Sequence, residues 1–298
     1  MAALASAVET AGAKLVLVGD AAQLQPIEAG AAFRAIVERI GAAELSGVRR
    51  QRAAWQQKAT QDLSRGNVRG ALKAYRAAGL IHQPATRDEA IAEITRDYMV
   101  ARAVRPGSET LILAHTNADV LALNAAVRAA LKTRGDLSGE HTFVTARGAR
   151  PFAPGERVLF LENRRLPSQT GANDPVAVKN GMLGTVESVE HDRLTLRIDG
   201  DTTDKARRVT IDAGEYASFD HGYATTIHKA QGATVDRTFL LASGRMDGHM
   251  TYVGLTRHRH EARLYGEDTG VQRLAGDAPS LARHDRRQEQ ERHPRPRY

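Results

Sequence analysis

One short segment in the last third of the chain gathers hydrogen-bond donors: Thr225-Thr226-Ile227-His228-Lys229-Ala230-Gln231-Gly232. On a helix, Thr225, His228 and Lys229 fall near one face. Hydroxyl, imidazole and ammonium groups suit a phosphate–sugar backbone, which takes donors and needs no readout of base edges. Gln231 and Gly232 follow, and the glycine lets the main chain approach a bound strand closely. The alternative is a capped amphipathic helix whose polar residues are incidental.

A second segment places polar groups directly after an apolar run. Residues 14–18 read Lys-Leu-Val-Leu-Val and predict a short strand covered on both faces. Gly19 and Asp20 then lie at its carboxyl end, where open parallel sheets bind their ligands. The amide of Gln23, just beyond that edge, can hydrogen-bond the terminal phosphate of a nucleotide. A plain strand-to-loop turn with a solvated Gln23 is the alternative.

Composition favours an anionic partner. The formal charge is +7 and the pI is about 9.8, which points first to nucleic acid. A solvated basic surface with a basic tail is the bland alternative. The absence of cysteine excludes disulfides, thiol nucleophiles and Cys-based zinc sites. No metal site is predicted, because His258 and His260 have no acidic or thiol partner at a suitable spacing.

Targeting signals are not apparent in the sequence. The first ten residues lack a basic start, their apolar run is short, and Glu9 interrupts it. No apolar stretch approaches the length that spans a membrane. We therefore expect a cytoplasmic protein with no membrane partner.

Hydrophobic patterns predict an α/β fold. Helices are expected at residues 2–11, 29–40, 53–64, 68–78, 86–103 and 117–132, and buried strands at 110–114 and 238–242. Four short strands separated by turn residues are expected at 158–161, 183–189, 194–198 and 208–211. This pattern predicts a parallel sheet with flanking helices and a small inserted β-barrel.

Three segments in order resemble motifs of superfamily 1 helicases, in the RecD-like, 5′-to-3′ branch. They are Gly19-Asp20-Ala21-Ala22-Gln23-Leu24-Gln25-Pro26, the donor segment at 225–232, and Tyr252-Val253-Gly254-Leu255-Thr256-Arg257. Residues 27–34 are similar to the helicase part of Ti-type conjugative relaxases. The resemblance implies a RecA-like P-loop NTPase lobe whose insertion is an SH3-like barrel.

The resemblance also implies roles for individual residues. Gln23 would sense the γ-phosphate of ATP, and Arg50 and Arg257 would reach that phosphate across a cleft between two lobes, with Arg49 as the neighbouring alternative to Arg50. Other members of the ATP site would be Gly19, Asp20 and Gly232. Single-stranded DNA would be bound by Thr225, Thr226, His228, Lys229 and Gln231.

The phosphate-binding motif Gly-x-x-x-x-Gly-Lys-Ser/Thr does not occur in the sequence. By the resemblance, this loop and a Mg²⁺-binding Asp-Glu pair would precede Met1. We therefore expect ATP and Mg²⁺ to bind in the complete protein and neither to bind this chain alone. The expected partners are single-stranded DNA, an upstream first RecA-like lobe and a relaxase domain of the same natural chain.

Five regions are predicted. They are a remnant of the first RecA-like lobe (1–42), the first part of the second lobe (43–150), the inserted barrel (151–214), the last part of the second lobe (215–266) and a basic disordered tail (267–298). The predicted function is the C-terminal segment of an ATP-dependent DNA helicase or translocase from a conjugative relaxase–helicase. The alternative is a non-enzymatic single-stranded-DNA-binding or regulatory remnant without ATPase activity.

Overall fold

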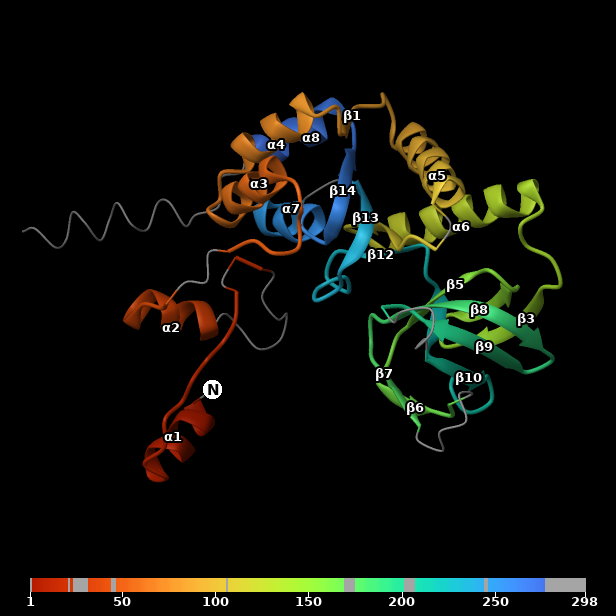
Figure 1. The fold of residues 1–298 in the computed structure, drawn as a ribbon, viewed down its shortest axis with the longest axis horizontal. Helices are drawn as coiled ribbons and strands as arrows, with labels where there is room; N and C mark the ends of the chain where they lie inside the picture. Colours follow the sequence, from red (N-terminus) through yellow and green to blue (C-terminus); the bar gives the residue numbers. More distant parts are fainter. Residues whose placement is uncertain are drawn as a thin grey trace, which may run out of the picture.

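The structure, a computed structural model, describes residues 2–20, 22–23, 32–43, 47–105, 107–168, 175–200, 207–243 and 246–276. The predicted helix start at residue 29, the turn after residue 170 and the tail beyond residue 276 lie outside these ranges. Within them, no helix combines the length and the apolar character needed to cross a bilayer. Figure 1 shows an α/β unit with a β unit beside it.

A five-stranded parallel sheet forms the centre of the α/β unit, in the order β1-β14-β13-β2-β12. The strands are Ile81–His82 (β1), Thr110–Ala114 (β2), Ala224–Thr226 (β12), Val235–Leu241 (β13) and His258–Tyr265 (β14). Every residue of β2 is buried, as is typical of a parallel strand covered on both faces. The predicted strands at 110–114 and 238–242 are confirmed as β2 and most of β13.

Helices cover both faces of the sheet (Figure 1). One group is Ala54–Ser64 (α3), Val68–Ala77 (α4), Gly248–Leu255 (α7) and Asp268–Gly276 (α8), and the other is Arg87–Val104 (α5) and Asn117–Arg134 (α6). Along β2, Leu111 and Leu113 pack with the first group, whereas Ile112 and Ala114 pack with the second. This alternation follows from the two-residue period of a strand.

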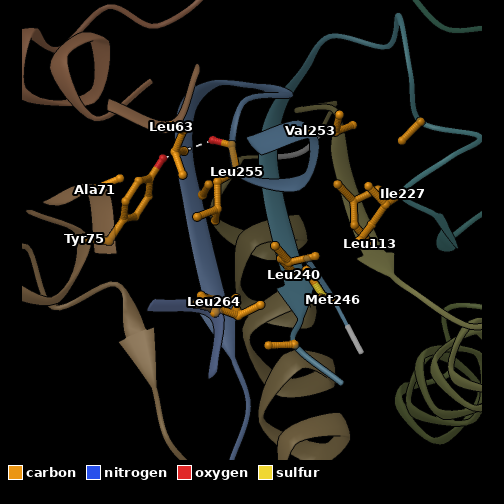
Figure 2. Packing of buried hydrophobic residues seen from close by; sticks show 14 of the residues in the cluster. Leu63, Ala71, Tyr75, Leu113, Ile227, Leu240, Met246, Val253, Leu255 and Leu264 are labelled. Carbon is orange, nitrogen blue, oxygen red and sulfur yellow. Dashed lines mark hydrogen bonds between the residues drawn. The ribbon is translucent and has the colours of Figure 1, made fainter. Parts of the chain in front are cut away.

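The hydrophobic core between the sheet and the group α3, α4, α7 and α8 fixes the end of α7 (Figure 2). The hydroxyl of Tyr75 in α4 donates a hydrogen bond to the carbonyl oxygen of Leu255, 3.1 Å away, and both residues are buried. Leu240 of β13 and Leu264 of β14 belong to the same cluster. This packing and the hydrogen bond therefore fix the position at which the chain leaves α7.

Helix α8 corrects one prediction. Residues from 267 onward were predicted to be a disordered tail, but α8 begins at Asp268. Val271 and Leu274 are buried in the same core as α4 and α7. Two apolar side chains three residues apart suffice to dock this short helix.

The β unit is inserted between α6 and β12. Its main sheet is antiparallel, in the order β10-β9-β8-β5-β11, and two hairpins, β3–β4 and β6–β7, accompany it. The strands are His141–Thr145 (β3), Gly148–Phe152 (β4), Arg157–Phe160 (β5), Arg164–Leu166 (β6), Val176–Val178 (β7), Leu183–Glu190 (β8), Arg193–Ile198 (β9), Arg208–Asp212 (β10) and Phe219–His221 (β11). Its separate core reaches from Phe143 to Phe219, so the insertion is wider than the predicted 151–214.

The chain returns from the insertion to the lobe at Gly222. Its amide donates to the carbonyl oxygen of Arg157, 2.8 Å away. A Cβ at this position would lie 2.7 Å from the main-chain carbon of Val158, so only glycine allows this close contact between strands. Tyr223 alone then separates Gly222 from β12.

The N-terminal segment differs from its prediction. Helices Ala2–Thr10 (α1) and Ala32–Ile40 (α2) stand away from the sheet (Figure 1). The strand predicted at residues 14–18 is not formed, and Val16 and Val18 are 70% and 89% exposed. A strand needs a hydrogen-bonding neighbour, and no described residue pairs with this segment.

Candidate functional site

Arg50 lies in the loop before α3 and contacts two distant elements. Its Nε donates to Thr234 Oγ1 at 2.9 Å, and one terminal nitrogen donates to the carbonyl oxygen of Thr256 at 2.8 Å. The side chain is half-buried, whereas that of Arg49 is exposed. Of the two arginines considered from the sequence, the structure thus brings Arg50 to the end of α7.

Arg257 follows α7 at the start of β14 and is only 2% exposed. Its Nε donates to the carbonyl oxygen of Val253 at 3.0 Å, and a terminal nitrogen donates to Thr256 Oγ1 at 3.1 Å. The guanidinium is therefore folded back against the last turn of α7. Thr256 is the common acceptor that places Arg50 and Arg257 side by side.

The two guanidiniums raise each other's electrostatic energy. Burial, and secondarily the charge of Arg50, lowers the pKa of Arg257 to about 10. Burial also lowers the pKa of Arg50. Within the described ranges neither side chain forms an ion pair with a carboxylate. Asp20 offsets part of the charge of Arg257, and an anion placed beside two partly desolvated cations is stabilised.

The segment around Asp20 meets α7 at this place. Tyr252 donates through its hydroxyl to Asp20 Oδ2 at 2.9 Å, and the amide of Gln23 donates to the same oxygen at 2.9 Å. His249 Nδ1 lies 2.8 Å from the carbonyl oxygen of Ala22. Asp20 and Gln23 are therefore brought to the helix that precedes Arg257.

Gly19 and Gly232 occupy the margins of this arrangement. A Cβ on Gly19 would lie 3.1 Å from the ring of Phe33, so the glycine allows α2 to pack closely. Gly232 has a φ of +82° with open space around it, a conformation that favours glycine. It comes two residues before Thr234, the acceptor of the Arg50 Nε bond.

Sequence reasoning missed four participants: Gln51, His249, Tyr252 and Thr256. Gln51 is 2% exposed and its amide donates to the carbonyl oxygens of Thr256 and His258. In the sequence, Gln51 follows Arg50 and Thr256 precedes Arg257. Both were usable signals, because buried amide and hydroxyl groups usually form hydrogen bonds.

The donor segment is not the helix predicted from its spacing. Residues 224–226 form β12, paired in parallel with β2, and residues 227–232 form successive turns. Thr225 and Thr226 are buried, His228 and Lys229 are half-buried, and Gln231 is exposed. The helix prediction failed because β-branched threonines beside an available edge of β2 favour pairing. Thr225 and Lys229 nonetheless line one hollow next to the insertion.

Metal ligands do not gather in the parts of the chain that the structure describes. No group of three or more His, Asp or Glu side chains there has the arrangement to hold an ion. Asp20 lies near Arg257 and Tyr252. The guanidiniums of Arg50 and Arg257 suit the phosphate end of a nucleotide.

Comparison with known proteins finds relatives in sequence and neighbours in fold. It is 48% identical over 265 residues to the conjugal transfer protein TraA of Agrobacterium fabrum, covering 89% of this chain and 23% of that protein. A probable TraA of Sinorhizobium fredii is 47% identical over 255 residues. The chain is homologous to one segment of the TraA conjugal transfer proteins. It spans less than a quarter of the length of these TraA relatives.

Structural comparison adds a likeness in fold. The crystal structure of Bacteroides Pif1 bound to single-stranded DNA superimposes with a TM-score of 0.54 at 17% identity, over 93% of this chain and 67% of that one. Residues 1–86 match the AAA domain family. The parallel sheet with flanking helices thus has the fold of a RecA-like P-loop lobe, as predicted.

Proposed function

We propose that this chain is a segment of an ATP-dependent DNA helicase or translocase, within a conjugative relaxase–helicase. It binds single-stranded DNA and contributes Gln23, Arg50 and Arg257 to the terminal phosphate of ATP. The observation that supports this most is the adjacent pair of arginines, held by Thr256 and without a carboxylate partner among the described residues. Their common anchor suits one multiply charged anion.

The chemistry of phosphoryl transfer explains why such a pair is useful. Bound ATP supplies a γ-phosphate whose equatorial oxygens carry charge as its bond loosens. Guanidiniums donate in fixed directions and remain charged, so they stabilise that charge without reorganising. Gln23, which donates to Asp20, would report the phosphate to α7. Gly19, Asp20 and Gly232 shape the margins of the same site.

The proposal assigns ATP and Mg²⁺ to the complete protein. A first RecA-like lobe of the same natural chain would supply the phosphate loop and the Mg²⁺-binding carboxylates. The arginines would then face that lobe across a cleft, and closing the cleft would complete the site. The 298-residue chain alone is expected to show no ATP turnover, and its partners in the complete protein would include a relaxase domain.

The donor segment is the proposed contact to DNA. Thr225, Thr226, His228, Lys229 and Gln231 offer hydroxyl, imidazole, ammonium and amide groups along β12 and the turns after it. The likeness in fold to a Pif1 structure bound to single-stranded DNA is consistent with this assignment. We further propose that the insertion, with its five-stranded main sheet, is an SH3-like barrel and that the protein acts in the cytoplasm, where plasmid DNA is available.

The test is ATP turnover in the complete natural polypeptide, with single-stranded DNA as activator. Arg257→Ala should lower DNA-stimulated turnover by at least about 100-fold, since arginines of this kind contribute ~10³ or more. The dissociation constant for single-stranded DNA should stay within about twofold, because the Arg257 side chain hydrogen-bonds Val253 and Thr256 and not the donor segment. Arg52→Ala is the matched control, since Arg52 is exposed and lies two residues from Arg50.

Two outcomes would overturn the proposal. Unchanged turnover in Arg257→Ala would remove the role of the arginine pair. DNA affinity that is indifferent to ATP, together with no turnover in the complete polypeptide, would show the non-enzymatic DNA-binding alternative instead.

A further inference from the structure

A hollow lies where the lobe meets the insertion, and both units line it. From the lobe come Asn117 at the first turn of α6, Thr225 of β12, and Lys229. From the insertion come Arg147, in the turn between β3 and β4, Leu159 of β5, and Asp220 of β11. Arg147 lies 78 positions before Thr225 in the sequence, and nothing in its surroundings there suggests a site.

The charges around this hollow are unbalanced. Burial, and then the charge of Arg147, lowers the pKa of Lys229, while Asp220 opposes the effect. Asp220 is shared, because its carboxylate lies 3.2 Å from Arg150 Nε and 3.8 Å from Arg147 Nε. The ammonium of Lys229 makes no ion pair with any described residue. Three cations thus face one carboxylate, and the surplus is positive.

An unsatisfied hydroxyl points to the same place. Thr225 is 2% exposed, and its Oγ1 has no hydrogen-bond partner among the described residues. A buried polar atom without a partner is costly and rare in native proteins. The positive dipole end of the 18-residue helix α6 lies near Asn117, and Asp119 in the same first turn offsets part of it. The unpaired hydroxyl and the surplus positive charge both favour a bound anion.

We propose that this hollow binds one backbone phosphate of single-stranded DNA, and that Arg147 of the insertion is a DNA-contacting residue together with Lys229 and Thr225. Asp220 is the internal anion with which that phosphate competes for Arg147. This inference rests on the proposed binding of single-stranded DNA and adds to it that the insertion contributes directly to the DNA path.

The geometry of the Arg147–Asp220 pair allows such an exchange. At 3.8 Å the two charged atoms are beyond hydrogen-bonding distance. The Arg147 side chain is 37% exposed, whereas that of Asp220 is 14% exposed. Arg147 can therefore turn to a phosphate without unfolding the hairpin, and Asp220 keeps its contact to Arg150.

The experiment is equilibrium binding of a fluorescent oligo-dT of about 15 nucleotides, a length within the usual site sizes of ~4–16, at several salt concentrations. Arg147→Ala should weaken binding several-fold and lower the slope of log K against log salt by about 0.7, the value for one phosphate contact on a single strand. Arg147→Lys should restore part of the affinity. Asp220→Asn should tighten binding, because it removes the competing charge and keeps the oxygen that accepts from the His221 amide.

Arg208→Ala is the matched control. Arg208 is an insertion arginine paired with Glu187 on β8, at 2.7 Å, and its loss should leave the affinity and the salt slope unchanged. The fluorescence of Trp55, the only tryptophan, checks that each variant is folded.

The outcomes separate this inference from the proposed function. If Lys229→Ala weakens binding but Arg147→Ala and Asp220→Asn do not change it, the role of Arg147 is wrong and DNA binding stands. If the unmodified chain binds no oligo-dT at low salt, the proposed DNA binding fails as well. If millimolar inorganic phosphate binds the unmodified chain and not Arg147→Ala, yet does not compete with the oligonucleotide, the hollow is a site for free phosphate and the inference is overturned.

Discussion

The guanidinium of Arg50 donates to the main-chain oxygen of Thr256, 2.8 Å away, across 206 residues of sequence. Gln51 donates to the same oxygen at 3.1 Å. The hydroxyl of Thr256 in turn accepts from Arg257 at 3.1 Å. One threonine therefore positions two arginines, one through its main chain and the other through its side chain, and the two contacts can be tested separately.

Thr256→Val should disturb Arg257 while sparing Arg50, because it removes the hydroxyl and keeps the carbonyl. We expect DNA-stimulated ATP turnover of the complete polypeptide to fall by about tenfold, with a loss of about 1 kcal/mol in the free energy of unfolding. Thr95→Val is the control, since Thr95 makes the same backward hydrogen bond in α5, to Ile91 at 2.8 Å. Equal turnover in the two variants would contradict the positioning role.

Gln51→Leu should destabilise the chain. Its amide satisfies the carbonyl oxygen of His258 at 3.0 Å as well as that of Thr256, and a buried carbonyl left unpaired costs about 1–3 kcal/mol. The urea midpoint should fall accordingly. Gln61→Leu, ten residues further on in α3 and with no side-chain hydrogen bond to a main-chain carbonyl among the described residues, should leave the midpoint nearly unchanged. If Gln51→Leu and Gln61→Leu have equal urea midpoints, the carbonyl oxygens of Thr256 and His258 accept hydrogen bonds from other donors.

Tyr252→Phe should release the segment around Asp20, because it removes the hydroxyl that holds the carboxylate at 2.9 Å. Trypsin should then cleave after Lys14 several-fold faster, since cleavage rate follows the population of the released segment. Tyr216→Phe removes a hydroxyl that donates to Glu162, at 3.0 Å in the insertion, and should not change the rate. Equal cleavage rates in Tyr252→Phe and Tyr216→Phe would mean that other contacts, at His249 or α2, keep this segment in place.

His258 should make the chain acid-sensitive. Burial, with the charges of Arg50 and His260, lowers its pKa to about 4, against 6.5 when unfolded. The unfolded chain takes up a proton below pH 6.5 and the folded chain does not, so stability is lost as pH falls from 6.5 towards 4. The loss from this group at pH 5 is about 2 kcal/mol relative to pH 7.

His258→Leu should remove that part of the pH dependence, and the exposed His141 offers His141→Leu as a control that keeps it. Urea unfolding at pH 7 and pH 5 measures both. A His258→Leu variant that loses as much stability at pH 5 as the unmodified chain would assign the acid sensitivity to other groups.

Local patterns predicted most elements of the lobe. The helices at 53–64 and 68–78 are α3 and α4 to within one residue at each end, because their apolar spacing matches the helical period. Thr86 caps α5, accepting from the amide of Glu89 at 3.2 Å. The helical period and the helix cap depend on residues close together in the sequence, so a short stretch of sequence is enough to predict them.

The site depends on contacts between residues far apart in the sequence, which no short stretch of sequence reveals. Thr225 and Thr226 were predicted to be helical, yet pairing with β2 places them in a strand. The hydrogen bond from Tyr252 to Asp20 spans 232 residues, and only the fold brings those residues together. The spacing of motifs indicated Arg50 and Arg257, but their shared anchor at Thr256 became visible only in three dimensions.

The return of the chain through Gly222 has a mechanical consequence. Between the last strand of the insertion and β12 there are two residues, which fully extended span about 7 Å, and Gly222 is already pressed against β5. This two-residue connection cannot lengthen further. A force on the insertion would therefore be transmitted directly to Thr225 and Thr226. The strand that carries these donor residues would be the first part of the lobe to be displaced.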